Sequence, residues 1–424
     1  MMETLRLFAA LGPGDIVRAR RNRAAGLAVS ETSIAFSEQL FAYCRHTQIK
    51  ILAISSHEKP DRLEEENLTL ENRPKPFRGR GGLMFHLSQI VYAADLAFRA
   101  WYFGAELAII DSGTTHYFAL TLFRLLGIPV AVNLHNVLWP RGYPPKGMVG
   151  KSIRNLNQVF FRYAAVGAIG VSPECEAQVL LESRGAVPFF QYRCQFDSVG
   201  FQPADRYRGG TFRIAFVGRA EQSKGLLDVA EIASALRNRS SVKVVFEVCG
   251  DGPALPRLME VVKRRQLDET VLIRGRLERG ALLQVYARSH AVIVPTRSNF
   301  TEGMPQVCAE AVLSDLPVIT SQVANAFDVI GASTLRSETD DVQSYVTSIM
   351  SLIEDRSLYQ RLRTECGSLS LQFLDRSRSY PAAVDRLIGA IFGRALLADY
   401  AGLFGEADNR PVDGQGRPAR DIAR

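Results

Sequence analysis

Short apolar runs alternate with longer helical patterns along most of this 424-residue chain. In the first half these runs span residues 5–11, 49–55, 107–111, 130–134 and 168–171, and in the second half 212–218, 243–250, 271–275, 291–295 and 318–321. Helical patterns lie between them, for example at 33–46, 83–103 and 117–126. Apolar strands separated by helices are typical of parallel sheets that are buried on both faces and joined by right-handed crossovers. The sequence therefore predicts an α/β protein with two doubly wound, Rossmann-like parallel sheets.

The chain is too long for one ordinary hydrophobic core, so we expect two domains of similar size. The polar, Gly- and Pro-containing stretch 196–211 predicts the boundary, which gives domains 1–200 and 201–370. Helices in 371–398 are expected to return toward the first domain, and the Gly/Pro/charge-rich residues 399–424 to be disordered. Residues 61–82 are charged and read as a long mobile loop. Two facing domains of this kind bind ligands in a cleft at the carboxyl ends of their strands.

The composition narrows the class of protein. Six cysteines are scattered without a CxxC pair, which disfavours a zinc site and a disulfide framework, so we expect no metal site and a reducing compartment. No apolar run reaches the roughly 18–20 residues that a membrane span needs, and the first residues do not read as a signal peptide. We therefore expect a cytoplasmic protein.

The charge of the chain is moderately basic, with a formal net charge of +7. Such an excess suits an anionic ligand, an acidic membrane surface or nucleic acid, and by itself does not choose among them. Four arginines (Arg18, Arg20, Arg21 and Arg23) lie close together. They read first as part of a solvated loop, and second as a contact for anionic lipid headgroups or a phosphate-bearing acceptor on the inner face of the plasma membrane.

The first motif of the second half is GRAEQSKG at 218–225, which follows a predicted strand. Gly218 ends the strand, and Arg219 and Lys224 lie on the loop that enters the next helix. Two cations beside a helix N-terminus suit a diphosphate. Ordinary loop charges explain the motif, taken alone, at least as well. The turns GDGP at 250–253 and RGRL at 274–277 follow two further strands, and the backbone of the second could contact a nucleobase.

The second motif lies between residues 296 and 321. Pro305 suits the first turn of a helix predicted over 306–313, which places Glu302 on the loop at the helix mouth and Glu310 on the helix. Two carboxylates so placed can hold different parts of one polyol, and a carboxylate that accepts two hydroxyls is a natural ribose clamp. The free N–H groups of Gly303 and its neighbours point at the same mouth. An isolated pair of acids would more commonly be solvated surface residues.

Taken together, Gly-Arg…Lys-Gly, GDGP, the G-R turn and E-G-M-P…E form an ordered series that resembles the family 4 retaining glycosyltransferases of the GT-B fold. The resemblance is strong over about 212–321 and extends to the first half only in organisation. It implies that Arg219 and Lys224 hold the donor diphosphate and that Glu310 clamps the ribose. It also implies that the mouth binds the transferred sugar, through Glu302, Gly303, Met304 and Pro305, and that the turn at Arg276 and Leu277 contacts the base.

In the first half, the glycine-rich loop of this family has a partial match in Gly12-Pro13-Gly14, where a proline separates the two glycines. His135, in the sequence NLHN at the end of a predicted strand, matches a histidine that approaches the reacting sugar or the acceptor in similar enzymes. A satisfied structural histidine is the alternative for this residue.

The resemblance implies a retaining, hexosyl-type transfer that needs no metal and no cofactor beyond the nucleotide diphosphate-sugar substrate. The expected acceptor is a saccharide or a lipid-linked saccharide of cell-surface polysaccharide synthesis, with no nucleic-acid partner. Two alternatives stay open. One is a nucleotide-sugar epimerase of the same fold, and the other is a catalytically inactive nucleotide-binding protein or membrane adaptor.

Overall fold

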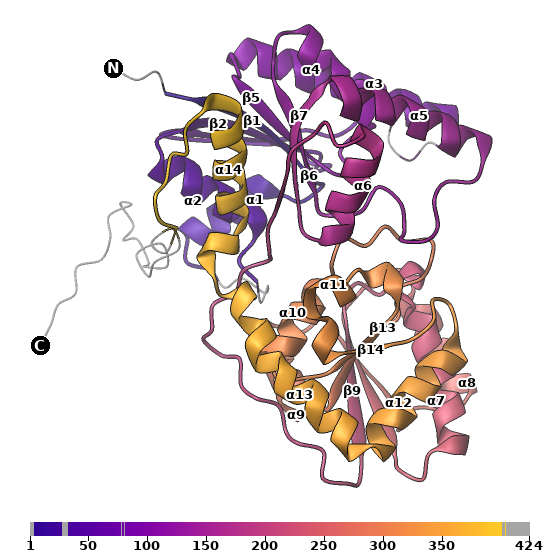
Figure 1. The fold of residues 1–424 in the computed structure, drawn as a ribbon. Helices are drawn as coiled ribbons and strands as arrows, with labels where there is room; N and C mark the ends of the chain where they lie inside the picture. Colours follow the sequence, from indigo (N-terminus) through magenta and orange to yellow (C-terminus); the bar gives the residue numbers. More distant parts are fainter. Residues whose placement is uncertain (1–3, 28–32, 78, 80, 401–402, 404–424) are drawn as a thin grey trace, which may run out of the picture.

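The computed structural model describes residues 4–27, 33–77, 79, 81–400 and 403, and it folds into two sheets with helices on both faces (Figure 1). The first sheet has the order β3-β4-β2-β1-β5-β6-β7-β8, and all its neighbours are parallel except β3 and β4. Its strands are β1 (Arg6–Leu11), β2 (Lys50–Ser55), β3 (Asp61–Glu65), β4 (Leu68–Asn72), β5 (Leu107–Asp111), β6 (Val130–Leu134), β7 (Ala165–Gly170) and β8 (Phe189–Gln191).

The helices of the first domain cover both faces of this sheet. They are α1 (Ile16–Ala24), α2 (Phe36–His46), α3 (Leu83–Phe103), the 3₁₀ turn η1 (Tyr117–Leu120), α4 (Thr121–Leu125), α5 (Met148–Tyr163) and α6 (Pro173–Ser183). In Figure 1, α3, α4 and α5 lie at the top of the molecule, and α1 and α2 lie on the opposite face of the sheet.

The second sheet is entirely parallel, in the order β11-β10-β9-β12-β13-β14. Its strands are β9 (Phe212–Val217), β10 (Val244–Cys249), β11 (Val271–Gly275), β12 (Ala291–Val294), β13 (Val318–Thr320) and β14 (Thr334–Arg336). The 3₁₀ turn η2 (Gln222–Lys224) precedes the helices α7 (Leu226–Arg239), α8 (Leu255–Arg264), α9 (Arg279–Arg288), α10 (Gln306–Leu313), α11 (Phe327–Ile330), α12 (Val342–Glu354) and α13 (Arg356–Ser370).

The predicted fold class is therefore confirmed, and each of the ten predicted strands is present. Because apolar runs long enough for a strand are buried on both faces here, the sequence pattern located them well. Strands β3, β4, β8 and β14 were not predicted. The two short ones, β8 and β14, have only three residues each.

The expectation of a loop over residues 61–82 is wrong for its first part, because β3 and β4 form an antiparallel hairpin at the edge of the first sheet. In β4, Leu68, Leu70 and Asn72 are buried and alternate with half-buried residues, as expected of a strand with one face on the core. The edge strand β3 is largely charged, which protects a sheet edge from pairing with other chains. Because strands were predicted from apolar runs, this charged strand was not recognised in the sequence.

The expectation of a solvated loop around Arg18–Arg23 is also wrong, because these residues lie in α1. The Asp15 side chain caps this helix by accepting a hydrogen bond from the Arg18 N–H at 2.9 Å. Arg20 is buried and paired with Glu38 and Glu65, and Arg21 is paired with Asp61. Arg23 also pairs with Glu38. Most of this basic run therefore neutralises acids of the first domain.

Beyond α13 the chain crosses back to the first domain, where α14 (Tyr380–Phe392) packs against α2, β7 and β8 (Figure 1). The Tyr43 hydroxyl of α2 donates a hydrogen bond to the Asp385 carboxylate of α14 at 2.7 Å. One continuous hydrophobic cluster includes residues of the first domain, of α10 and of α14. The two domains are thus fastened together on one side of the cleft.

Three further observations concern the expectations above. All six cysteines are free and buried, as small apolar residues of a core are. No helix among the described residues is long and apolar enough to cross a membrane. Apart from residues 399, 400 and 403, the expected tail 399–424 lies outside the described residues.

Candidate active site

A cavity of about 480 Å³ lies where the carboxyl edge of the first sheet meets the second domain. The ends of β1, β5, β6 and β7 reach it, and α2, α14 and the start of α10 close it. Of the predicted site residues, the cavity brings together Gly12, Gly14, His135 and Met304. Its other lining residues are Leu11, Ile16, Ala35, Phe36, Ser37, Asp111, Val171, Cys194, Gln306 and Tyr380.

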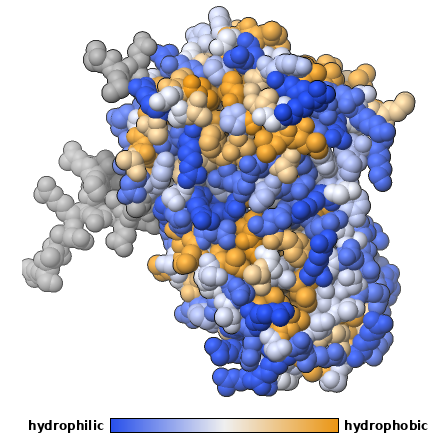
Figure 2. Space-filling model, in the orientation of Figure 1, coloured by the Kyte–Doolittle hydropathy of each residue, from blue (hydrophilic) through white to orange (hydrophobic). Residues whose placement is uncertain are grey.

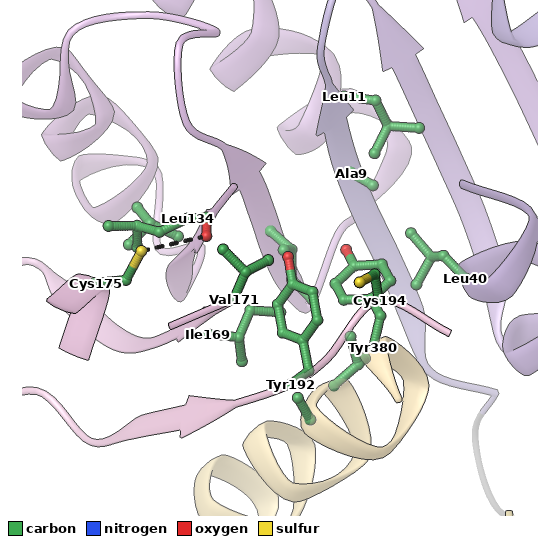
Figure 3. Packing of buried hydrophobic residues seen from close by; sticks show 14 of the residues in the cluster. Ala9, Leu11, Leu40, Leu134, Ile169, Val171, Cys175, Tyr192, Cys194 and Tyr380 are labelled. Carbon is green, nitrogen blue, oxygen red and sulfur yellow. Dashed lines mark hydrogen bonds between the residues drawn. The ribbon is translucent and has the colours of Figure 1, made fainter. Parts of the chain in front are cut away.

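The floor of this cavity is aromatic. Figure 3 shows Tyr192 and Tyr380 side by side, close to Val171 and Cys194, with their ring centroids 5.1 Å apart. Burial raises the pKa of both hydroxyls well above the ordinary value, so both stay protonated. Because closely packed rings have few alternative rotamers, this floor is a rigid support for the residues above it.

His135 stands on this floor at the end of β6, and both of its ring nitrogens are engaged. The Tyr192 hydroxyl donates to the Asn133 side-chain oxygen at 2.7 Å and lies 3.0 Å from His135 Nδ1. His135 Nε2 lies 3.2 Å from the Asp111 carboxylate and 2.9 Å from the Asn133 amide nitrogen. The Phe36 ring packs against the imidazole at 4.8 Å. The network fixes the orientation of the ring, and a substrate can reach the part of the side chain that remains exposed.

The second domain touches His135 directly through Gly303. A Cβ atom at Gly303 would lie 2.0 Å from the His135 carbonyl oxygen and 2.7 Å from a methyl carbon of Val171, closer than any real contact. Only glycine lets the two backbones approach so closely. Among the described residues, the N–H groups of Gly303 and Met304 donate to no acceptor, so they remain available at the mouth of α10.

Beside this contact lies an ion pair between Lys224 and Glu302. The sequence predicted these two residues on different loops. Both are largely buried, with side chains 18% and 9% exposed. The Phe300 ring lies 4.2 Å from the Lys224 ammonium, the Thr296 hydroxyl donates to Glu302, and Asn325 holds the Glu302 backbone. A partly buried cation and carboxylate therefore meet at the carboxyl edge of the second sheet.

The local sequence explains how Lys224 arrives there. Gly225 has φ +72°, and a Cβ at this position would lie 2.0 Å from the Pro295 carbonyl oxygen. The glycine lets the loop after β9 pack onto the loop after β12, which carries Glu302. Pro305 precedes the first residue of α10, as the sequence predicted, and its fixed φ favours the entry into the helix.

Glu310 is buried on α10, and the hydroxyl of Tyr286 on α9 donates a hydrogen bond to its carboxylate. Burial, and then the Glu310 charge, raise the pKa of Tyr286 well above its ordinary value. The tyrosine therefore stays a donor and holds the carboxylate in one orientation. Neither Glu302 nor Glu310 lines the cavity described above, so both predicted carboxylates lie outside it.

The remaining predicted residues are more exposed. Arg219 keeps 66% of its side-chain surface in solvent and pairs with Glu221 at 2.8 Å. Gly218 lies against the turn after β10, because a Cβ on Gly250 would lie 1.8 Å from the Gly218 carbonyl oxygen. Arg276 is exposed and Leu277 is half-buried, on the loop after β11. Neither of these two residues lines the cavity.

Sequence reasoning missed four residues of the site: Asp111, Phe36, Tyr192 and Tyr380. Asp111 carried a signal, since an acid at the end of a buried strand is expected at the ligand-binding edge of a parallel sheet. The three aromatic residues carried none, because aromatic residues are common in any core.

Residues 211–355 match the family model "Glycosyl transferases group 1". No curated protein matches the sequence.

The chain is similar in structure to sucrose-phosphate synthase from Thermosynechococcus elongatus, with a TM-score of 0.66, 13% identity and coverage of 92% of this chain and 99% of the other. It is also similar to Anabaena HepE in complex with UDP, with a TM-score of 0.60, 13% identity and coverage of 92% and 100%. A third similar structure, trehalose-6-phosphate from E. coli bound with UDP-2-fluoro glucose, gives a TM-score of 0.63, 11% identity and coverage of 87% and 96%. The protein thus has the two-domain GT-B fold, and its second domain matches the group 1 glycosyltransferases.

Proposed function

We propose that this protein is a retaining glycosyltransferase that moves a hexosyl group from a nucleotide diphosphate-sugar to a saccharide acceptor. The observation that carries the proposal is the meeting of three groups at the mouth of α10. These are the Lys224 cation, the Glu302 carboxylate and the free N–H groups of Gly303 and Met304, directly against His135 of the other domain. Such a mouth can bind a phosphate and sugar hydroxyls together.

The donor lies across the carboxyl edge of the second sheet. Lys224 and Arg219 hold the diphosphate, and Arg219 exchanges its exposed pairing with Glu221 for the more highly charged ligand. Glu310, oriented by Tyr286, accepts the ribose hydroxyls, and the loop at Arg276 and Leu277 contacts the base. Two structurally similar proteins are in complex with UDP and with UDP-2-fluoro glucose. We therefore choose a uridine nucleotide as the first donor to test.

The transferred sugar lies between the two domains. Glu302 and the Gly303–Met304 backbone accept and donate hydrogen bonds to its hydroxyls, and His135 and the Gly12–Gly14 loop bound it from the first domain.

In the reaction, the bond between the anomeric carbon and the diphosphate oxygen breaks. The acceptor oxygen forms the new bond on the same face, and its proton passes to the departing phosphate. Lys224 and Arg219 stabilise the charge that grows on the leaving group, which is the role a divalent cation has in metal-dependent enzymes. Removing one preorganised contact of this kind typically costs about 3–4 kcal/mol of transition-state stabilisation.

We propose a saccharide or lipid-linked saccharide of cell-surface polysaccharide synthesis as the acceptor, with the enzyme acting from the cytoplasmic side. An epimerase of the same fold would consume the donor without an acceptor and release an isomeric sugar. An inactive nucleotide-binding protein would bind the donor without turnover.

The test is a thermal-shift panel of UDP-, GDP-, ADP- and dTDP-sugars, followed by assay of nucleotide release with a mixture of saccharide acceptors. One nucleotide class is expected to raise the Tm of the wild type and of the control Lys243→Ala, whose exposed lysine pairs with Glu269. The shift is expected to vanish in Lys224→Ala, each variant being compared with its own ligand-free Tm. A protein that no nucleotide stabilises would refute the proposal.

Two further readouts test the reaction itself. NMR of the product is expected to show the anomeric configuration of the donor, and excess chelator is expected to leave the rate unchanged. Inversion at the anomeric carbon, or activity that returns only with Mn²⁺, would refute the mechanism while leaving the donor site intact.

A further inference from the structure

Every exposed residue of the 21-residue helix α3 is apolar, and its charged residues Asp95 and Arg99 are half-buried in ion pairs. Its exposed side chains are Leu83, Phe85, Leu87, Ile90, Val91, Ala94, Phe98, Trp101 and Tyr102. Phe98, Trp101 and Tyr102 are 57%, 53% and 83% exposed. A surface helix normally places charged and polar residues on its solvent-exposed side, so α3 lacks the polar face that solvent requires.

The apolar surface continues onto the neighbouring helices. Helix α3 contacts η1 and α4, and α5 contacts η1 from the other side. These elements add exposed side chains of Leu125, Leu126, Met148, Val149, Leu156, Val159 and Tyr163. Figure 1 shows α3, α4 and α5 along the top of the first domain, and Figure 2 shows apolar side chains at the surface there. We call this surface the α3–α5 face. Contiguous exposed apolar surface of this extent marks an interaction site.

The charge of this region identifies the partner. From residue 112 to residue 173 the sequence contains no aspartate or glutamate, but it contains six arginines and lysines. Arg141, Arg154 and Arg162 bond to groups on other elements. Within the described part of the chain, the exposed side chains of Arg124, Lys146 and Lys151 meet no acid.

An apolar surface flanked by unpaired cations is complementary to an anionic lipid bilayer, where acyl chains receive the apolar groups and headgroups receive the charges. Trp and Tyr side chains, like those of Trp101, Tyr102 and Tyr163 here, favour the same interface. A second copy of the chain is a poorer partner, because pairing this face with itself would bring two acid-free basic segments together.

We propose that the α3–α5 face lies on an anionic membrane surface without spanning it. The Arg18–Arg23 run, whose side chains pair mainly within the domain, is not needed for this contact. Helix α3 begins after the carboxyl end of β4 and α5 after that of β6, so the starts of both helices point to the same edge as the cleft. Leu83 and Met148, at those starts, are 81% and 85% exposed.

A bilayer on this face therefore lies next to the cleft mouth, where an acceptor attached to a lipid can enter. This last step rests on the proposed function, whereas the docking itself does not.

The test is co-sedimentation of the full chain with vesicles of phosphatidylcholine alone or with about 30% phosphatidylglycerol, whose headgroup is anionic. We expect binding to the anionic vesicles that is at least about tenfold stronger than to the neutral ones. The double substitution Phe98→Glu with Trp101→Glu should weaken it by more than about tenfold, since charges replace the apolar contact. Met259→Glu, on α8 of the second domain, is the matched control because Met259 is 55% exposed.

The two tryptophans provide an independent readout. Trp101 is 53% exposed and Trp139 only 8%, so the blue shift of fluorescence on adding anionic vesicles should come from Trp101. Trp101→Phe should still bind the vesicles but lose the blue shift. A blue shift that persists in this variant would overturn the assignment of the face.

Other outcomes would also overturn the proposal: no sedimentation with anionic vesicles, equal binding to neutral ones, or equal loss of binding in Met259→Glu. Self-association without lipid that the Phe98→Glu, Trp101→Glu variant abolishes would overturn it in favour of a second copy as partner. The nucleotide thermal shift, measured on the same variants, separates this proposal from the enzymatic one. Loss of vesicle binding with an unchanged shift supports docking alone, and absence of any shift refutes only the glycosyltransferase.

Discussion

The close approach of Gly303 to His135 gives the sharpest test of how the two domains form one site. In Gly303→Ala the new methyl group would begin 2.0 Å from the His135 carbonyl oxygen, and the neighbouring Val171 would be 2.7 Å away. An ordinary carbon–oxygen contact is longer by more than about 1 Å. The two domains must therefore separate locally, or one backbone must shift.

The His135 side is the less able to move, because Asp111, Asn133 and Tyr192 hold its ring. We therefore expect the α10 mouth to retreat from the first domain. Overpacking of this kind costs about 1–3 kcal/mol. If that cost falls on the closed, reactive arrangement, kcat/KM falls by about 5- to 150-fold, since each 1.4 kcal/mol is a factor of about ten.

The control is the same substitution at Gly367, in the interior of α13, where a Cβ would meet no atom within 4 Å. Alanine there should stabilise the helix by about 0.5–1 kcal/mol. Urea unfolding and steady-state kinetics measure both variants. A Gly303→Ala protein with wild-type kcat/KM would refute the argument that the two backbones must touch during the reaction.

Three further changes test individual contacts. Lys224→Ala leaves the 9%-exposed Glu302 carboxylate without its cation, so urea unfolding should show a free energy of unfolding lower by about 3 kcal/mol. The control Lys243→Ala, at an exposed ion pair, should lower it by less than about 1 kcal/mol. Similar losses in both variants would contradict the argument from burial. Tyr286→Phe removes the donor to the buried Glu310 and should cost about 1–3 kcal/mol by the same measurement, while an unchanged stability would mean that this hydrogen bond is dispensable. Burial raises the pKa of Glu247, but hydrogen bonds from Arg288 and Arg274 outweigh it and hold that pKa below its ordinary 4.5. The ionised Glu247 therefore stabilises the folded state above pH 4.5, and this stabilisation is lost as the pH falls through the lowered pKa of Glu247. Glu247→Gln should remove this part of the pH dependence of the free energy of unfolding.

The sequence by itself determined the layered architecture and the places where the chain can bind a ligand. Strands buried on both faces require continuous apolar runs, and this local pattern located β9 to β13 and the loops that follow them. The prediction of α10 over 306–313 agrees with the structure because a proline before a helix and an apolar stretch after it are local signals.

The sequence did not reveal three of the four edge strands, nor which side of a helix faces solvent. Strand β3 is charged because it lies at a sheet edge, and its sequence resembles that of a loop. Helix α3 is rich in apolar residues, which is typical of a buried helix, and only the packing of the domain reveals that its apolar side faces outward while Ser88 and Gln89 are buried.

Only the tertiary structure decided which distant residues meet. The contact of Gly303 with His135, the pairing of Lys224 with Glu302 and the hydrogen bond from Tyr286 to Glu310 join segments that no local pattern relates. The periodicity of a sequence indicates which side of a helix or strand is buried, but it does not indicate which other element packs against that side. That choice follows from how two sheets and their helices pack into one cleft, where shape and charge must agree over the whole surface at once.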